Sequence, residues 1–358
     1  MGFKLNPLTR KKLRRFRSIK RGYWAFIALG ITFLLSLFAE LLVSNRALFV
    51  SYEGEWYFPT YGAQINGTTF GLDYGYETNY RELADNFEAD EDSGNWLLLP
   101  LVPYDPYEND YVREDARGYS PPAWDTVHLL GTDKTERDVL ARLFYGFRIS
   151  ILFALGYLIL TYFIGTCAGC IMGYFGGKTD MFGLRLVEIW ANVPFLYMVI
   201  ILVSVIPDGW GTGIRVTLLL LIMVLFSWTG MTYYVRASSY KEKAREYVAA
   251  AKVMGAGPGR VIFKHLLPNV ISTLVTFAPF TVAAAVTSIT ALDFLGFGLP
   301  SPTPSWGELL KQGVNNLREA PWIVVSTVTA LVLTLTLVTF VGEAVREAFD
   351  PKRFSTYE

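Results

Sequence analysis

The sequence has 358 residues, of which 52% are hydrophobic and only 18% charged, whereas a soluble domain normally carries about a quarter charged residues. This composition excludes an ordinary soluble globular protein and indicates a membrane protein. The formal net charge is zero. The two cysteines, Cys167 and Cys170, exclude a disulfide framework beyond a single bridge.

The chain starts with a basic segment, residues 1–21, followed by an apolar run from Trp24 to Val43. The apolar core of a signal peptide is only about 7–15 residues long and ends at a small-residue cleavage site. This run is longer and no Ala-x-Ala pattern closes it, so residues 22–44 are predicted to form a first transmembrane helix.

Five more apolar runs follow, near residues 149–174, 186–206, 216–235, 270–292 and 322–345. Each is close to the roughly 20 residues that a membrane-spanning helix needs. A transmembrane barrel would show short alternating runs instead. The sequence therefore predicts an all-α membrane protein with six transmembrane helices, in which residues 149–345 form the core.

Lys and Arg near the ends of the spans predict the orientation. Residues 1–21, the segment 236–268 and the tail 346–358 are expected in the cytoplasm, and residues 45–148 form a large insert on the opposite side. The insert is rich in aromatic residues and has an acidic cluster. We predict that it either caps its own bundle or docks a partner or substrate through Asp85, Glu88, Asp90, Glu91 and Asp92.

The stretch from Arg245 to Asn269 is polar and basic between two apolar runs. Ser238 or Ser239 is expected to cap a helix that runs to about Met254, and Gly255 is a natural end for it. Pro258 suits the first turn of a second short helix, which is expected to end before Pro268. Such a helix pair fits a socket on a soluble partner.

This stretch resembles the EAA loop of ABC-importer permeases, on which the ATPase subunit acts. Ala250, Ala251, Gly255, Leu267 and Pro268 match the family pattern, and Ala249 stands where the acidic residue is usual. The resemblance implies an ATPase-coupling set: Glu246, Ala249, Ala250, Ala251, Gly255, Ala256, Arg260, His265 and Pro268.

Other stretches are similar to the dipeptide and oligopeptide permeases: Leu130–Ser150, Asp293–Leu310 and Gly342–Phe354. The long aromatic insert is similar to that of the Yej-type permeases. The resemblance implies a type I importer fold in the bacterial inner membrane and a cargo of oligopeptides that includes microcin C. It also implies a second permease subunit, partner ATPases that bind ATP and Mg, a periplasmic binding protein, and no cofactor or nucleic acid on this chain.

Asp293 opens the segment before the last span and, with Phe294, Gly296 and Trp306, is predicted to form part of the substrate path or its gate. A polar contact at a helix end is an equal alternative for Asp293. Pro194 and Pro279 are expected to kink their spans. Small-residue spacing at Gly165, Gly169 and Gly173 predicts a helix–helix contact.

Several motifs are rejected. The segment Gly173–Thr179 is similar to a phosphate loop but lacks its first glycine and its preceding strand. Cys167 and Cys170 have redox spacing but lie in an apolar span, and both are predicted to be small buried residues. His128 and His265 lie in no metal-ligand pattern.

Two other functions are alternatives for this chain. A secondary transporter is expected to carry charged residues at mid-membrane and related halves, and neither is evident. A membrane-anchored binding or sensor module would use the acidic insert but would leave the helix pair at residues 245–269 without a role.

Overall fold

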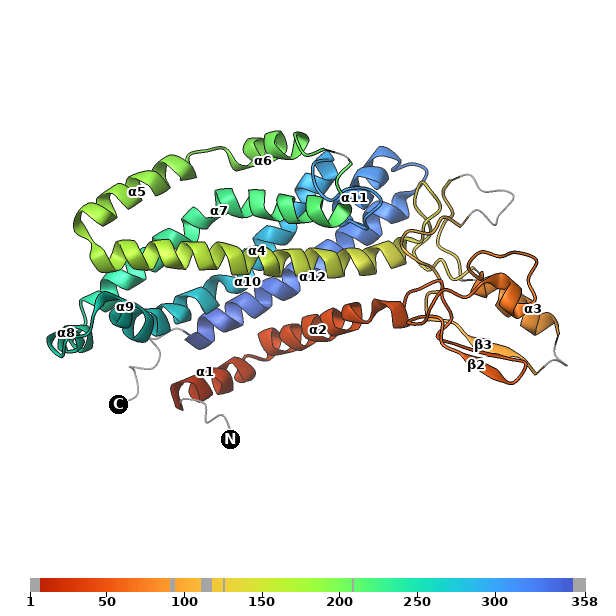
Figure 1. Cartoon of the computed structure of the whole chain (residues 1–358), viewed down its shortest axis with the longest axis horizontal. Helices are drawn as coiled ribbons and strands as arrows, with labels where there is room; N and C mark the ends of the chain where they lie inside the picture. The colour runs from red at the N-terminus through yellow and green to blue at the C-terminus, as the bar shows by residue number, and fades with distance from the viewer. Residues whose placement is uncertain (1–6, 91–93, 111–117, 125, 208, 350–358) are drawn as a thin grey trace.

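The computed structural model of the protein describes residues 7–90, 94–110, 118–124, 126–207 and 209–349. Long helices run roughly along one axis of an elongated molecule (Figure 1). The helices of these residues are α1 (Pro7–Ser18), α2 (Lys20–Leu37), α3 (Tyr80–Ala89), α4 (Val139–Phe175), α5 (Gly177–Ala191), α6 (Phe195–Ser204), α7 (Thr212–Lys243), α8 (Glu246–Val253), α9 (Pro258–Val261), α10 (Leu267–Leu295), α11 (Trp306–Asn315) and α12 (Pro321–Phe349).

Four helical segments of the described residues are long and apolar enough to cross a membrane: α4, α7, the run Pro258–Leu295 and α12. The pair α5 and α6 makes a fifth if it counts as one bent span. α2 has 18 residues but starts with Lys20 and Arg21, and it is not among these segments. Helices thus occupy all six predicted positions, and six crossings stay a prediction.

The predicted all-α fold class is wrong for the region between α2 and α4. Strands β1 (Phe49–Tyr52), β2 (Glu55–Tyr57) and β3 (Trp96–Leu98) form an antiparallel sheet in the order β2-β1-β3. Val50 lies opposite Tyr57 on one side and Leu97 on the other. Strands of three or four residues show too little alternation to be recognised from sequence.

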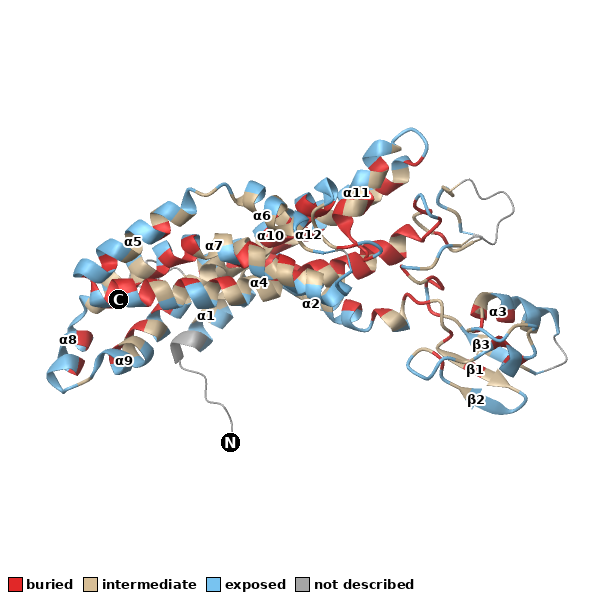
Figure 2. Cartoon of the chain, turned by 45° about the horizontal axis from the view of Figure 1, so that its top comes forward, coloured by how far each residue is buried: buried red, intermediate tan, exposed pale blue. Residues whose placement is uncertain are grey.

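The sheet and α3 enclose a hydrophobic core of their own at one end of the molecule (Figures 1 and 2). Val50, Phe70, Tyr80 and Leu83 are buried together in this core. Asn79 caps α3, because its side-chain oxygen accepts hydrogen bonds from the first backbone N–H groups of the helix. The aromatic-rich segment therefore folds as a packed unit rather than a loose linker.

The helix that follows the insert begins before the predicted boundary at Arg148. α4 starts at Val139, where Asp138 accepts a hydrogen bond from the Ala141 backbone N–H at 2.7 Å. Its first turns carry charged residues, and one of them, Arg148, forms a 2.9 Å ion pair with Glu40. Because α4 has 37 residues, more than one crossing needs, the end of the insert at Arg148 stays a prediction.

The glycine contact predicted on the second apolar run is confirmed: α4 packs backbone to backbone on α7, and the two helices run side by side (Figure 1). A Cβ added at Gly169 would lie 2.7 Å from Val235 Cβ and 2.8 Å from the Thr232 carbonyl oxygen. Gly165 and Gly173 meet α7 in the same way one turn on either side. Only glycine permits so close an approach of the two helices.

The predicted break at Pro194 is confirmed. α5 and α6 meet there at an angle of 71°, and they arch along the outside of α7 (Figure 1). Pro279, in contrast, lies inside α10 without ending it. Cys170 is buried, as predicted, whereas Cys167 is exposed, contrary to the prediction.

Candidate functional site: the α8–α9 hairpin and the insert end

The short helices α8 and α9 form a hairpin at the end of the bundle opposite the insert (Figure 1). α8 ends as predicted at Gly255, which has a φ of +83°. The Gly255 N–H donates to the Lys252 carbonyl, and the Ala256 N–H donates to the Ala251 carbonyl. This is a complete Schellman motif, and it fixes a sharp end that glycine adopts without strain.

The predicted start of this helix is wrong. α7 continues to Lys243, and α8 begins only at Glu246. Ser239 is buried inside α7, against Gly173 and Cys170 of α4, and caps nothing. Sequence alone does not distinguish a serine at a helix end from one buried in a helix–helix contact, because both are small and polar.

The predicted end of the second helix is also wrong. α9 does not stop before Pro268 but continues through a π-helical turn, Ile262–Leu266, into α10. Pro268 then lies at the start of α10, directly after the π-helical turn. α9 is therefore continuous with a helix of membrane-spanning length, Pro258–Leu295.

A small core anchors the hairpin to the bundle. Val248 of α8 and Val261 of α9 are fully buried with Leu266 against Tyr174, near the end of α4. The Tyr247 hydroxyl donates to Glu242 at 2.7 Å and accepts from the Asn269 amide at 2.9 Å. The hairpin thus contacts α4, α7 and α10.

Seven of the nine predicted coupling residues lie in α8, α9 and the turn between them, whereas His265 lies in the π-helical turn and Pro268 at the start of α10. Those exposed are Glu246, Ala249, Ala250, Gly255, Arg260 and Pro268; Ala256 and His265 are half-buried, and Ala251 is buried. Sequence reasoning named Met254 as an apolar contact but missed two further exposed apolar side chains, Val253 of α8 and Phe263 of the π-helical turn. Val253, Met254 and Phe263 are 89%, 79% and 72% exposed.

At the other end, Asp293 is a buried structural anchor. One carboxylate oxygen accepts from the Leu299 N–H and the other from the Ser305 hydroxyl, both at 2.6 Å. Ser305 in turn caps α11. This geometry corresponds to the helix-end contact considered as the alternative for Asp293.

The three other residues predicted for the substrate path differ in position. Trp306 is buried, and its indole N–H donates to the Leu143 carbonyl at 2.9 Å. Gly296 ends α10 with a φ of +88°. Phe294 is partly exposed and lines an apolar hollow of about 350 Å³. Of the four, Phe294 alone presents a side chain to open space.

A second hollow, of about 270 Å³, lies between α4, α7 and α10. Several hydroxyl groups line it, among them those of Thr161, Tyr162, Ser227 and Thr281. The Tyr162 and Thr281 hydroxyls are hydrogen-bonded at 2.9 Å, whereas the buried Thr161 hydroxyl has no partner. Polar groups inside membrane spans indicate function, and their scatter over three helices hid this group from sequence analysis.

A network of largely buried ion pairs joins the segment before α4 to α4 and α11. Arg137 binds Asp133 at 2.8 Å, and Arg142, which is fully buried, pairs with Glu308 of α11 and lies 3.5 Å from Asp133. Asp133, Arg137 and Arg142 lie in the stretch Leu130–Ser150 that is similar to the oligopeptide permeases. The pairing of Arg142 with Glu308 was missed, because these two residues are 166 positions apart.

His128, left without a role by the sequence, lies buried between two carboxylates. Its Nδ1 is 2.9 Å from Asp138 and its Nε2 3.1 Å from Asp110. Burial alone lowers the pKa of His128, but the hydrogen bonds to Asp110 and Asp138 outweigh it, so the pKa lies above its ordinary value. The His128 side chain therefore links Asp138, at the start of α4, to Asp110 of the insert.

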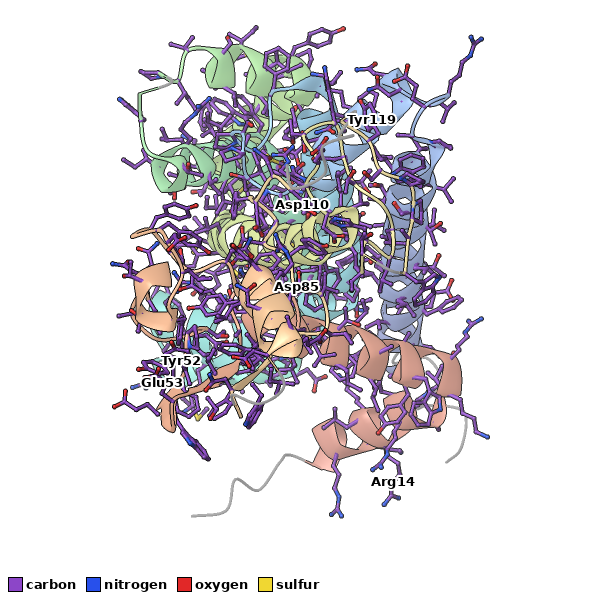
Figure 3. All side chains as sticks on the ribbon, turned by 90° about the vertical axis from the view of Figure 1, so that its right-hand side faces the viewer. Arg14, Tyr52, Glu53, Asp85, Asp110 and Tyr119 are labelled. Carbon is purple, nitrogen blue, oxygen red and sulfur yellow. The ribbon has the colours of Figure 1, made fainter. Side chains whose placement is uncertain are left out.

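The predicted docking acids Asp85, Glu88 and Asp90 are exposed on or just after α3. Glu91 and Asp92 lie outside the described residues. Figure 3 looks onto this end of the molecule, where Asp85 and Asp110 are labelled. Among the described residues, no group of three His, Cys, Asp or Glu side chains has an arrangement that could hold a metal ion.

Comparison with known proteins decides the family. Residues 165–355 match the family described as the inner membrane component of binding-protein-dependent transport systems. The chain belongs to this family. It is 38% identical to the peptidoglycan transport system permease protein YejE of Agrobacterium fabrum, over 97% of this chain and 94% of that protein.

Two curated relatives agree, and one solved structure is similar over part of the chain. The inner membrane ABC transporter permease YejE of Escherichia coli is 37% identical, over 98% of this chain and 99% of its own. The oligopeptide permease OppC of Haemophilus influenzae is 36% identical, over 64% of this chain and 72% of its own. The inward-facing MetNI methionine transporter aligns over 59% of this chain and 97% of its own, with 17% identity and a TM-score of 0.48. The chain is thus a YejE-like permease of an ABC importer for peptides.

Proposed function

We propose that the α8–α9 hairpin is the part of this permease on which a separate ATPase acts. The observation that carries the proposal is the exposed apolar group Val253, Met254 and Phe263 on a hairpin that its own core holds rigidly. Exposed apolar side chains on a fixed support are suited to a protein interface. ATP and Mg are bound by the partner, and the hairpin transmits the partner's movement.

The proposed orientation places the hairpin and α1 in the cytoplasm and the insert in the periplasm. The basic side chains of α1 and α2, among them Arg15 and Arg17, support it, since positive charge favours the cytoplasmic side. A second permease subunit then completes the translocation path. The hydroxyl-lined hollow around Thr161 and the partly exposed Phe294 are this chain's proposed contributions to that path.

We propose oligopeptides as the cargo, with peptide-nucleotide antibiotics such as microcin C among them. A peptide cannot cross hydrocarbon unaided, because each unpaired amide costs several kcal/mol there. The names of the YejE and OppC relatives, which refer to peptidoglycan and oligopeptide transport, support a peptide cargo. Microcin C rests on the resemblance to Yej-type permeases.

A periplasmic binding protein is the proposed donor of this cargo, and the exposed acids Asp85, Glu88 and Asp90 are its proposed docking surface. These carboxylates lie on the outward part of the insert, away from the hairpin (Figures 1 and 3). Complementary charge between partners speeds encounter. Neutralising the acids should weaken capture of the binding protein and leave folding intact.

Site-directed cross-linking tests the central proposal. A cysteine at Met254, in a background without Cys167 and Cys170, should form a cross-link to the co-purified ATPase. A cysteine at Trp124, which is 87% exposed on the insert side, is the matched control and should form none. Absence of the Met254 cross-link in every nucleotide state, or uptake driven by a pH gradient with an inactive ATPase, would refute the proposal.

A further inference from the structure

A hollow of about 340 Å³ lies between α2 and the bundle, where α2 faces α4, α10 and α12. All of its lining residues in the described part of the chain are apolar, among them Phe26 and Gly30 of α2, Phe147 of α4, Pro279 of α10 and Val341 of α12. Its volume reaches the lower end of the range of about 300–1,000 Å³ that is typical of ligand sites. Such a lining suits an apolar ligand, because a polar group would lose its hydrogen bonds there.

Two glycines of α2 show where the hollow opens. A Cβ added at Gly22 would clash with the Ala344 side chain and lie 2.8 Å from the Phe340 carbonyl oxygen, so α2 is held closely against α12 there. At Gly30, further along α2, a Cβ would meet no atom within 4 Å. Folded proteins leave few voids larger than a water molecule, so a gap of this size is filled by another molecule. Between helices of membrane-spanning length, the apolar molecules at hand are lipid acyl chains.

One end of the hollow leads to a basic surface, residues 10–21, on α1 and the first turn of α2. This segment contains eight Lys and Arg residues and no acidic residue. Two of its members, Arg15 and Arg21, pair with Glu347 and Glu343 of α12 at 3.7 and 2.9 Å. Within the described residues, eight basic charges against these two acids leave the surface strongly positive.

Two helices place the basic surface within reach of the hollow. Lys12 donates to the Ser272 hydroxyl of α10 at 3.3 Å, and Ser272 precedes Ala278, which lines the hollow, by about 9 Å of helix. On α2, Arg21 precedes Phe26 by about 8 Å. The headgroup region of one leaflet is roughly 5–8 Å thick. One phospholipid can therefore place its phosphate at the basic surface and an acyl chain in the hollow.

We propose that the hollow and the basic surface together bind one anionic phospholipid, with an acyl chain between α2 and the bundle and the phosphate at residues 10–21. Lys and Arg beside a membrane span attract anionic headgroups, and Arg binds phosphate through two parallel hydrogen bonds. The lipid fills the gap at Gly30 and so holds α2 to the bundle. The site rests on these contacts alone, and only its assignment to the cytoplasmic leaflet rests on the proposed function.

Native mass spectrometry of the purified full-length chain, which counts bound lipids, tests the proposal without ATPase or transport. The probes are dioleoylphosphatidylglycerol, which is anionic, and dioleoylphosphatidylcholine, which has the same chains and no net charge. We expect one phosphatidylglycerol to bind at least about tenfold more tightly, because several basic side chains face its charge. Equal binding of the two lipids would overturn the proposal. Glycerol phosphate, which lacks the chains, should not displace the lipid, and displacement would assign the basic surface to a soluble phosphate instead.

Two double variants test the headgroup contact. Arg14 and Lys20 are exposed, and Arg14 points away from the bundle (Figure 3). Arg14→Gln with Lys20→Gln should therefore leave folding intact and weaken phosphatidylglycerol binding about tenfold or more. Lys178→Gln with Arg185→Gln is the matched control, because it removes two exposed charges from α5 at the same end of the bundle (Figure 1), and it should leave binding unchanged. An equal loss in both double variants would mean unspecific attraction and contradict the site.

Two glycine variants test the position of the acyl chain. Gly30→Leu places a side chain in the hollow without a clash at its Cβ, and it should weaken phosphatidylglycerol binding about tenfold by displacing part of the chain. Gly230→Leu is the matched control, because Gly230 also has open space around its Cβ but lines the hydroxyl-lined hollow beside α7. Unchanged binding in Gly30→Leu would refute the placement of the chain.

The second permease subunit supplies the last arm. The bound lipid should persist in the assembled complex. If it were lost there, and Gly30→Cys formed a cross-link to the second subunit, the hollow would belong to a subunit interface and the lipid proposal would be wrong. None of these measurements depends on ATP hydrolysis or peptide uptake. Failure of this proposal is therefore distinguishable from failure of the proposed function.

Discussion

Replacing Gly255 by valine should uncouple ATP hydrolysis by the partner from peptide uptake. Gly255 has a φ of +83°, and no atom lies within 4 Å of a Cβ built on it. The cost of a side chain there is thus conformational and not steric. An L-residue in this region pays about 1–2 kcal/mol, and a β-branched residue is disfavoured further.

A cost of 1–2 kcal/mol reduces the population of the native hairpin end by about 5–30-fold relative to alternatives. The Schellman hydrogen bonds to Ala251 and Lys252 would open, and the angle between α8 and α9 would no longer be fixed. The bundle itself has no contact with the new side chain. We therefore expect normal assembly in the membrane and a lower ratio of peptide imported to ATP hydrolysed.

The assay measures ATP hydrolysis and peptide uptake in the same proteoliposomes that contain the full complex. Gly255→Ala and Gly259→Ala are a matched pair, because both positions lie in the hairpin in open space and only Gly255 has a positive φ. Coupling should fall in the order Gly255→Asn, Gly255→Ala, Gly255→Val and stay normal in Gly259→Ala. A wild-type ratio in Gly255→Val would refute the role of the hairpin.

Three further predictions concern stability, each measured by thermal unfolding of the purified chain. The pKa of His128 is raised in the folded protein. Its contribution to the free energy of unfolding should therefore be complete below about pH 6.5 and be lost as the pH rises through the folded pKa. His128→Gln should remove this pH-dependent part of the stability, and an unchanged dependence of stability on pH would contradict the prediction. Arg142→Met leaves Glu308 without its buried partner and should lower the free energy of unfolding by about 3 kcal/mol. Adding Glu308→Gln to this variant should restore part of the stability. An unchanged stability of Arg142→Met would show that the ion pair is dispensable. Gly169→Val forces α4 away from Val235 of α7 and should lower the free energy of unfolding by about 1–3 kcal/mol. An unchanged stability would mean that the contact between α4 and α7 can adapt to a side chain.

Much of this architecture follows from the sequence because it depends on local pattern. Each of the six long apolar runs predicted a helix where the structure has one, since a helix satisfies its own backbone hydrogen bonds. Gly255 and Pro258 predicted the hairpin turn for the same reason: a positive φ and a first-turn proline are local demands. The glycine spacing in α4 predicted a helix–helix contact but not its partner, α7.

Other features were decided by tertiary structure alone. In the sequence, Arg142 is an ordinary charged residue near a predicted span, and only the fold brings it to Glu308. Only the fold likewise places His128 between Asp110 and Asp138. The three-stranded sheet depends on pairing β1 with β3, more than forty residues away along the chain. Buried ion pairs, strand pairing and the lining of cavities all depend on contacts between residues that are far apart in the sequence. A local sequence pattern shows one residue of such a contact but does not identify the other.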